Sequence, residues 1–509
     1  MGGECESKNL GTGNLRLRIE PTINVTDQVR VMAQIDVFDN LILGSTPDSL
    51  INYRRPGDLT SRAPLGALSN TQVPPEVGQN GIVSSIRAKR AWGEVDSEFG
   101  SLRFGRMPWH FGRGIAFNNG NCPDCDGGTT VDRIMALTQV YGHQLAVAWD
   151  FGAQGYTAGM VDLGYRDPNG YPLDLSQRDD VLQLMVALTH IEDDRVFQER
   201  AAQGELMFNY GAQLVFRQQG HETYQLPMQT GTTTTKETPT GVEPTSPQVP
   251  AINPKTDLAA PGALTLDVDA TVIIPSLWMK LAWKSLTIEA ETTGVFGRIG
   301  NAGPLSADPN PLHRNLTLRQ LGWVLASELR LYKNAFSIGF ETGGATGDQA
   351  EEPRAYLNHN WKFVQQPAGD HALSDFKFSP EYHVDEILFR HLYGTVSNAV
   401  YVKPAMTYWM DLAERRQIGL NAAVIYSGAL VPVSTPGNSI SYGLEMNVGA
   451  TYRNPSDGFY AGITWAVLWP MSALDRPNTA SSTGGVTLWP SHQDTSAAQS
   501  LRTFLGIKF

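Results

Sequence analysis

Charged residues occupy every second position in several stretches of this sequence, where they alternate with apolar residues. Arg16 and Arg18, for example, alternate with Leu15, Leu17 and Ile19. Successive side chains of a β-strand point to opposite faces, so each stretch would place a row of charge on one face and an apolar row on the other. Fixed charges that border water select and orient small polar solutes, which is the chemistry these rows could perform.

The sign of the charged rows changes along the chain. A basic wall near the N-terminus comprises Arg16, Arg18, Arg30, Arg87, Lys89 and Arg103. An acidic wall further along comprises Asp267, Asp269, Glu289, Glu291, Glu328, Glu341 and Glu445. If the strands close into a barrel, we expect the two walls to lie roughly opposite each other and to create a transverse field in the pore. The alternative is that these residues are charged simply because water fills the interior.

Three cysteines are present, Cys5, Cys122 and Cys125, and the last two form a C-x-x-C motif. Zinc would require two more Cys or His ligands at a matching spacing, and none is evident, so we expect no metal and no other cofactor. A thioredoxin-like redox motif would require a βαβ setting, which the pattern lacks. We therefore expect a disulfide between Cys122 and Cys125 that closes an external loop. The oxygen-rich stretch 118–126 leaves calcium binding as an alternative.

Neither catalysis nor nucleic-acid binding is indicated. The sequence contains no G-x-S-x-G, H-E-x-x-H or P-loop pattern, and its 10 histidines form no arrangement that pairs one with a serine. The formal charge of -12 opposes binding to nucleic acid, which requires a basic surface. We expect a protein that is not an enzyme, with an enzyme as the least favoured alternative.

The elements that must position these residues are β-strands. Alternating segments recur at 15–20, 29–37, 82–94, 99–107, 131–141, 144–152, 179–190, 206–217, 266–282, 286–296, 317–332, 335–343, 397–409, 416–427, 440–453, 459–469 and 499–509. No apolar run is long enough for a transmembrane helix, but about 9–11 residues of tilted strand suffice to cross a bilayer. The connections alternate between short and long, as do the periplasmic turns and external loops of outer-membrane barrels. We therefore predict an all-β fold, a transmembrane antiparallel β-barrel of 16–18 strands that forms a single domain over residues 1–509.

The C-terminal stretch supports a barrel. Its alternation places Leu501, Thr503, Leu505, Ile507 and Phe509 on one face. This ending resembles the closing strand of bacterial outer-membrane barrels, and the resemblance assigns Leu501, Leu505, Ile507 and Phe509 to the signal read by the barrel-assembly machinery. The first and last visible strands both run from the outside toward the periplasm, so the visible antiparallel strands are odd in number. Such barrels have an even number of strands. We therefore infer 18 native strands, of which 17 are visible and one precedes Gly11.

Two long connections differ in character. Connection 218–265 is rich in Thr, Pro and Gly, which is typical of low-complexity surface. Connection 344–396 contains Pro380, followed by a helix-like run that ends at Gly394. This run either folds into the barrel mouth and narrows the channel, or it caps the rim.

Stretches 15–25, 35–47, 105–112 and 385–390 resemble a poorly characterised set of myxobacterial-type outer-membrane proteins. The resemblance implies an envelope location, a barrel, and a leader with at least one strand upstream, but it implies little about a substrate. We expect a porin-like channel for passive diffusion of small polar solutes. The alternative is a plugged or structural barrel whose long loops bind a surface partner. The expected partners are outer-membrane lipid, lipopolysaccharide, the barrel-assembly machinery and the solutes, and the oligomeric state stays open.

Overall fold

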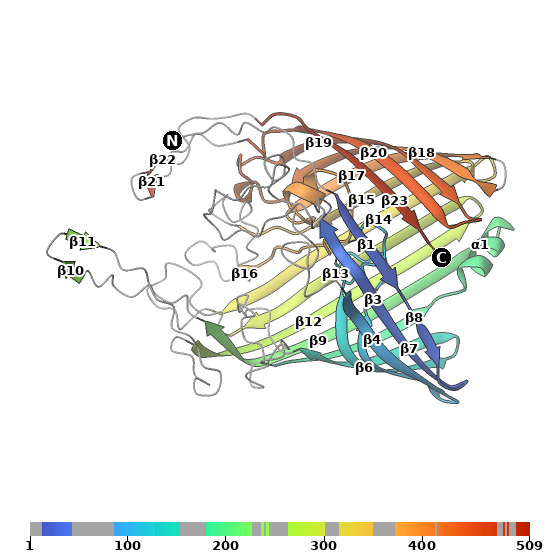
Figure 1. Cartoon of the computed structure of the whole chain (residues 1–509), viewed down its shortest axis with the longest axis horizontal. Helices are drawn as coiled ribbons and strands as arrows, with labels where there is room; N and C mark the ends of the chain where they lie inside the picture. Colours follow the sequence, from blue (N-terminus) through green and yellow to red (C-terminus); the bar gives the residue numbers. More distant parts are fainter. Residues whose placement is uncertain are drawn as a thin grey trace, which may run out of the picture. The chain divides into compact units, whose positions relative to one another are not determined.

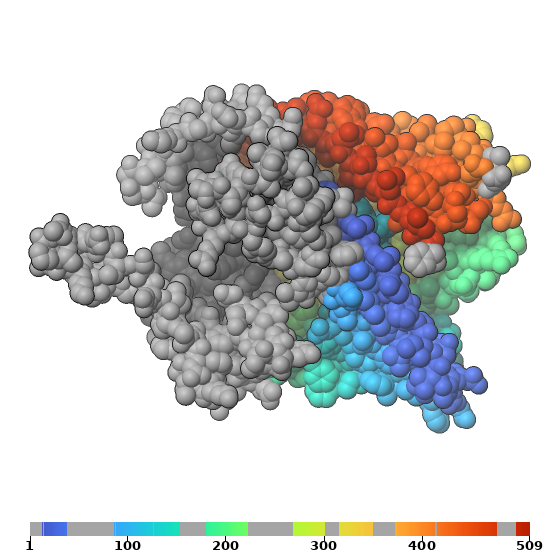
Figure 2. Space-filling model, viewed as in Figure 1, coloured from blue at the N-terminus to red at the C-terminus, as the bar shows by residue number. Residues whose placement is uncertain are grey.

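The computed structural model describes residues 13–42, 86–125, 127–152, 180–225, 236–238, 241–243, 263–300, 315–349, 372–412, 415–475, 482–483, 486–487 and 495–508. Figure 1 shows the order of the elements, and Figure 2 shows the same view with all atoms drawn.

The principal element is one antiparallel sheet of 19 strands. Seventeen are long, and each overlaps one of the segments expected from the alternation, so the all-β fold class is confirmed. They are β1 (Asn14–Ile19), β3 (Val29–Ile42), β4 (Ile86–Ser97), β5 (Gly100–Pro108), β6 (Thr130–Val140), β7 (His143–Gly152), β8 (Val181–His190), β9 (Met207–Gln225), β12 (Ala263–Trp283), β13 (Leu286–Ile299), β14 (Leu316–Leu331), β15 (Phe336–Ala345), β17 (Ala399–Asp411), β18 (Gln417–Ala429), β19 (Ser441–Asn454), β20 (Phe459–Pro470) and β23 (Ala498–Ile507).

The short elements are few among the described residues. Strand β2 (Thr22–Asn24) continues the pairing of β1 along β3 after Pro21, which lacks the N–H that an unbroken strand would use. Strand β16 (Ala372–Leu373) pairs in parallel with β14. The small hairpins β10 (Lys236–Thr238) with β11 (Gly241–Glu243), and β21 (Ser482–Thr483) with β22 (Val486–Thr487), form separate sheets. The helices are α1 (Asp194–Ala202), the π-helix η3 (Leu388–Leu392) and the 3₁₀-helix η5 (Pro432–Ser434). Within the described ranges, none of the helices has the length and apolar character needed to cross a bilayer.

One face of the sheet is apolar and exposed. Along β8, Leu182, Leu184, Val186 and Leu188 are each at least 40% exposed, whereas Met185 between them is 3% exposed. The same alternation recurs on the other long strands and leaves an extended apolar surface on each unit, which is stable in contact with lipid but not with water. The strands pair with neighbours, which satisfies their backbone groups within the hydrocarbon. The protein therefore belongs in the bacterial outer membrane, and the opposite face of the sheet is called the inward face below.

The connections keep the expected alternation in length. The hairpin between β6 and β7 turns at Tyr141 and Gly142, whose positive φ values of 50° and 78° suit a two-residue turn. The connection between β8 and β9 contains α1. Asp193 caps this helix by accepting from the N–H groups of Arg195 and Val196.

The chain divides into two compact units, which are described separately. Unit 1 comprises Met1–Pro108 with Thr130–Ala136, and unit 2 comprises Trp109–Thr129 with Leu137–Phe509. In unit 2 the long strands from β7 to β23 pair in chain order as an antiparallel meander. The expected single barrel domain stays a prediction.

The expected helical run over 380–394 is shorter than predicted. Helix η3 begins only at Leu388 and ends just before Gly394, which has a φ of 76°. The Glu445 carboxylate accepts from the N–H of Glu386, which precedes the helix, and from the N–H of Leu388, its first residue. Residues 380–387 form turns and bends instead of helix.

Candidate functional site

Two connections of unit 2 fold onto the inward face of its sheet. They are the 109–129 loop, which follows β5, and the 376–396 loop, which precedes β17. Their apolar residues form one buried cluster with strand residues. The loops contribute Ile115, Phe376, Phe378, Val384, Ile387, Leu388, Phe389 and Val396, and the strands contribute Val324, Ala345, Ala399, Tyr401, Ile425, Tyr442, Ala466 and Leu468. Full burial of each large side chain stabilises the docked loops by about 1.5–3 kcal/mol.

Arg113 holds the 109–129 loop against the acidic wall. Its Nη1 lies 2.8 Å from Glu289 Oε2, and its Nη2 lies 2.9 Å from Glu341 Oε2. The N–H groups of Arg113 and Gly114 donate to Glu291 Oε2 at 2.6 and 2.9 Å. The approach of Glu291 requires Gly112, because a Cβ there would lie 2.8 Å from Glu291 Oε2. Three members of the predicted acidic wall therefore hold a loop.

A fourth member, Glu445, holds the 376–396 loop. Its two carboxylate oxygens accept from the N–H groups of Glu386 at 2.8 Å and Leu388 at 3.1 Å. Asp385 accepts from the N–H groups of Phe389 and Arg390 at 2.9 and 3.1 Å. Burial raises the pKa of Asp385 to about 7, and the neighbouring Glu445 carboxylate adds to the rise, whereas the two backbone hydrogen bonds oppose it.

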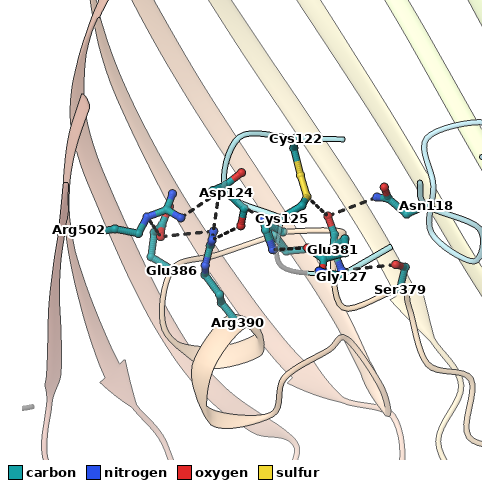
Figure 3. A network of polar contacts seen from close by, with 12 residues as sticks. Asn118, Cys122, Asp124, Cys125, Gly127, Ser379, Glu381, Glu386, Arg390 and Arg502 are labelled. Atoms are coloured by element: carbon teal, nitrogen blue, oxygen red, sulfur yellow. Dashed lines mark hydrogen bonds and ion pairs between the residues drawn. A yellow bond between two sulfur atoms is a disulfide. The ribbon is translucent and has the colours of Figure 1, made fainter. Parts of the chain in front are cut away.

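The two loops and the last strand meet at Asp124 (Figure 3). Asp124 Oδ2 lies 3.1 Å from Arg390 Nη2 and 2.9 Å from Arg502 Nη1. His383 Nδ1 approaches the same oxygen at 3.4 Å. Burial alone would raise the pKa of Asp124, but the hydrogen bonds from His383 and Arg502 and the charge of Arg390 outweigh it and hold the pKa well below its usual range. Asp124 is therefore ionised at any physiological pH.

Further polar contacts join the two loops directly. Gly127 donates its N–H to Glu381 Oε1 at 2.5 Å, and Asn118 Nδ2 donates to the Glu381 carbonyl at 3.3 Å. Arg502 Nε lies 3.3 Å from Glu386 Oε2, which connects β23 to the same group. Figure 3 marks these contacts with dashed lines.

The C-x-x-C motif lies within this group. Cys122 and Cys125 are joined by a disulfide, and their sulfur atoms lie within 4.8 Å of ligand atoms of Asp124 and His383. With both sulfurs engaged in the disulfide, these four residues do not offer a thiolate pair to a metal ion. The oxygens of the alternative calcium site have protein partners: Asn118 Oδ1 accepts from Gly120 and Asn119 Oδ1 accepts from Asn121. Cys5 and Asp126 lie outside the described residues.

The basic wall in unit 1 is paired with carboxylates of neighbouring strands. Arg18 Nε lies 2.8 Å from Asp36 Oδ1, and Lys89 Nζ lies 3.8 Å from Asp36 Oδ2. Arg30 contacts Asp96 at 2.8 Å. Arg103 contacts Glu94 at 2.8 Å. Arg16 shares the side of Arg18, opposite the exposed Leu15 and Leu17, and the Arg87 side chain lies outside the described residues.

One member of the acidic wall does not face inward. A β-bulge between Asp267 and Ala270 gives Asp269 a φ of 40° and places Val268 in a buried cluster with Ile299 and Leu373. Asp269 is instead exposed and lies 3.4 Å from Arg298. The extra residue of the bulge reverses the alternation that the sequence indicated. Glu328 keeps its inward position and pairs with Arg330 at 2.8 Å, and the Asp267 side chain is outside the described residues.

The face expected to carry the assembly signal is exposed on β23. Leu501, Leu505 and Ile507 are 66–79% exposed, and Phe509 lies outside the described residues. Their role in assembly stays a prediction.

The residues that sequence reasoning missed are Arg113, Asp124, Asp385 and Arg390. The Gly112-Arg113-Gly114 triplet is a local signal of a tight turn that presents an arginine. Asp124 and Arg390 carry no local signal for their contact, because they lie 266 positions apart in the chain.

The known proteins to which this chain is similar are distant. No family model matches the chain, and no curated protein matches it. A solved structure of OccK5 (OpdH) from Pseudomonas aeruginosa is 8% identical, with a TM-score of 0.39, and the alignment covers 94% of this chain and 86% of that chain. A BenF-like porin from Pseudomonas fluorescens is 7% identical, with a TM-score of 0.39 and coverage of 96% and 90%. An anion-selective porin from Comamonas acidovorans is 9% identical, with a TM-score of 0.35 and coverage of 85% and 82%.

Proposed function

We propose that this protein is a porin-like channel through which small polar solutes diffuse passively across the outer membrane. The observation that carries the proposal is the hydrated charge on the inward face of unit 1. The side chains of Arg30 and Arg103 remain 40% and 36% exposed although they form ion pairs. Charges in the hydrocarbon thickness keep contact with water only where a water-filled passage exists.

The charge of that face favours anions. Among the described side chains of unit 1, seven inward cations (Arg16, Arg18, Arg30, Lys89, Arg90, Arg103 and Arg133) stand against four inward carboxylates (Glu20, Asp36, Glu94 and Asp96). An excess of one sign on the wall of a pore raises the local concentration of the opposite ion. We propose weak selectivity for small anions. We do not propose a transverse field between two opposed walls, because four carboxylates of the acidic wall hold the loops. They are Glu289, Glu291, Glu341 and Glu445.

The 109–129 and 376–396 loops form the proposed constriction. They occupy the inward face of unit 2 through ion pairs and a buried apolar cluster, so a solute that passes along this face meets their exposed residues. Leu392, at the end of η3, is 48% exposed. The resemblance of stretches 105–112 and 385–390 to myxobacterial-type outer-membrane proteins supports an envelope role for these same segments.

The runner-up is a plugged barrel whose loops serve a surface partner. Phe378 and Leu388 of the 376–396 loop are only 2% and 1% exposed, which favours this alternative, because a loop packed so completely would stay fixed in the barrel interior. Insertion of the purified full-length protein into planar bilayers separates the two proposals. If the protein is a channel, we expect discrete conductance steps. In a salt gradient, we expect a reversal potential with the sign of an anion-selective pore. Absence of steps at every voltage would leave only the plugged barrel.

A further inference from the structure

Asp124 lies in a turn with unusually little freedom. The turn consists of Cys122, Pro123, Asp124 and Cys125, and the disulfide closes it. The N–H of Cys125 donates to the carbonyl of Cys122 at 3.2 Å, and Pro123 fixes its own φ. A disulfide across so short a turn restricts the direction of the side chain between its ends. The ring therefore aims the Asp124 carboxylate.

The aimed carboxylate connects three separate parts of unit 2. Arg390 and His383 belong to the 376–396 loop, and Arg502 belongs to β23. The oxygen Asp124 Oδ2 is their common partner (Figure 3). Without it, the guanidinium groups of Arg390 and Arg502 would face each other with only Glu386 between them, and like charges at that separation repel. The network therefore depends on the position of one side chain.

The two sulfurs differ in access. Cys125 is fully buried at 0% exposure, whereas Cys122 is partly exposed. An attacking thiolate must reach one sulfur atom of a disulfide and expels the other as the leaving thiolate. Reduction would therefore begin at Cys122 Sγ. Cys125 Sγ would leave, 3.9 Å from the Glu381 carbonyl that its thiol can donate to.

We propose that Asp124 is a latch which holds the 376–396 loop against β23, and that the Cys122–Cys125 disulfide makes the latch redox-sensitive. A low-molecular-weight dithiol supplies two electrons and two protons: the S–S bond breaks, two S–H bonds form on Cys122 and Cys125, and the dithiol closes into its own disulfide. The freed turn no longer aims Asp124, and the loop leaves β23. Loop release is independent of the proposed channel, whereas its effect on conductance rests on that proposal.

The test measures hydrogen exchange of residues 381–393 in the full-length protein in detergent micelles, with and without dithiothreitol. We expect reduction to speed exchange of these amides at least about tenfold, and we expect Asp124→Asn to do so without reductant. The double variant Cys122→Ala with Cys125→Ala should exchange fast under both conditions. Asp132→Asn, which removes the carboxylate of an Asp–Arg pair in unit 1, is the matched control and should behave as wild type.

The outcomes separate the latch from the channel. Unchanged exchange in both reduced wild type and Asp124→Asn would overturn the latch, whatever the conductance. Fast exchange in Asp124→Asn with no response of wild type to dithiothreitol would overturn the redox control and retain the latch. Fast exchange in both without any conductance would support the latch and overturn the proposed channel. Heat-modifiable migration in gel electrophoresis confirms that each variant has folded.

Discussion

Removal of the Arg113 charge should release the 109–129 loop. In the variant Arg113→Met, the carboxylates of Glu289 and Glu341 would lose the cation that lies 2.8 and 2.9 Å away. The three side chains are only 16–22% exposed, so solvent screens the pairs little. Breaking a buried pair by removal of one partner costs about 3–5 kcal/mol, and the partial exposure here favours the lower end, about 3 kcal/mol. At about 1.4 kcal/mol per factor of ten, the undocked population should rise roughly 100-fold.

Hydrogen exchange of the Arg113 and Gly114 amides measures this release, because both donate to Glu291 while the loop is docked. The triple variant Arg113→Met, Glu289→Gln, Glu341→Gln should recover much of the protection, since it leaves no unpaired charge. Arg106→Met is the matched control: its pair with Asp132 is 57% and 44% exposed and should change stability by less than about 1 kcal/mol. Exchange of the Arg113 and Gly114 amides within twofold of wild type in Arg113→Met would refute the reasoning.

Three further predictions concern pH, selectivity and packing. The folded pKa of Asp385 is raised to about 7, so docking of the 376–396 loop is strongest below the ordinary carboxyl pKa and weakens as pH rises from that value to 7. Conductance should therefore increase from pH 5 to pH 7, and Asp385→Asn should reduce that increase, with an unchanged pH response as the contrary result. The double variant Arg16→Gln with Lys89→Gln should shift the reversal potential toward cation selectivity, since it removes two of the seven inward cations among the described side chains of unit 1 while Arg18 still pairs with Asp36. An unchanged reversal potential would show that the basic wall does not set the selectivity. Phe389→Ala should lower the free energy of unfolding by about 3–5 kcal/mol, because Phe389 is 3% exposed and packs edge-on against Tyr442; a loss below about 1 kcal/mol in denaturant titration would show that the loop is not packed as described.

The strands were predictable because their signal is local. Alternation along each segment defined all 17 long strands, and the even spacing of charge along β1 placed Arg16 and Arg18 opposite the lipid-facing leucines. The same rule failed at Asp269, where one extra residue in a β-bulge reverses the faces and nothing in the local pattern marks it. Pattern arguments therefore hold along regular strands and fail where the register changes.

The docking of the two loops was only partly predictable. The helix-like composition after Pro380 marked one of the two loops, but the contacts that hold the loops against the strands needed the structure. Two of these contacts, Arg113 with Glu341 and Asp124 with Arg502, join residues 228 and 378 positions apart. A single sequence contains no rule that pairs charges at such separations, so the acidic residues could be recognised as inward but not as partners of the loops.

The central claim is that the 376–396 loop sets the bore of the channel. The N–H of Phe378 donates to the carbonyl of Val396 at 3.0 Å, so the ends of the loop are adjacent and a short Gly/Ser linker can replace residues 379–395. Single-channel conductance of this variant and of the full-length protein, recorded in planar bilayers at the same salt concentration, tests the claim directly. We predict a conductance several times larger in the loop-replaced variant than in the full-length protein. Equal conductance in the two would contradict the account.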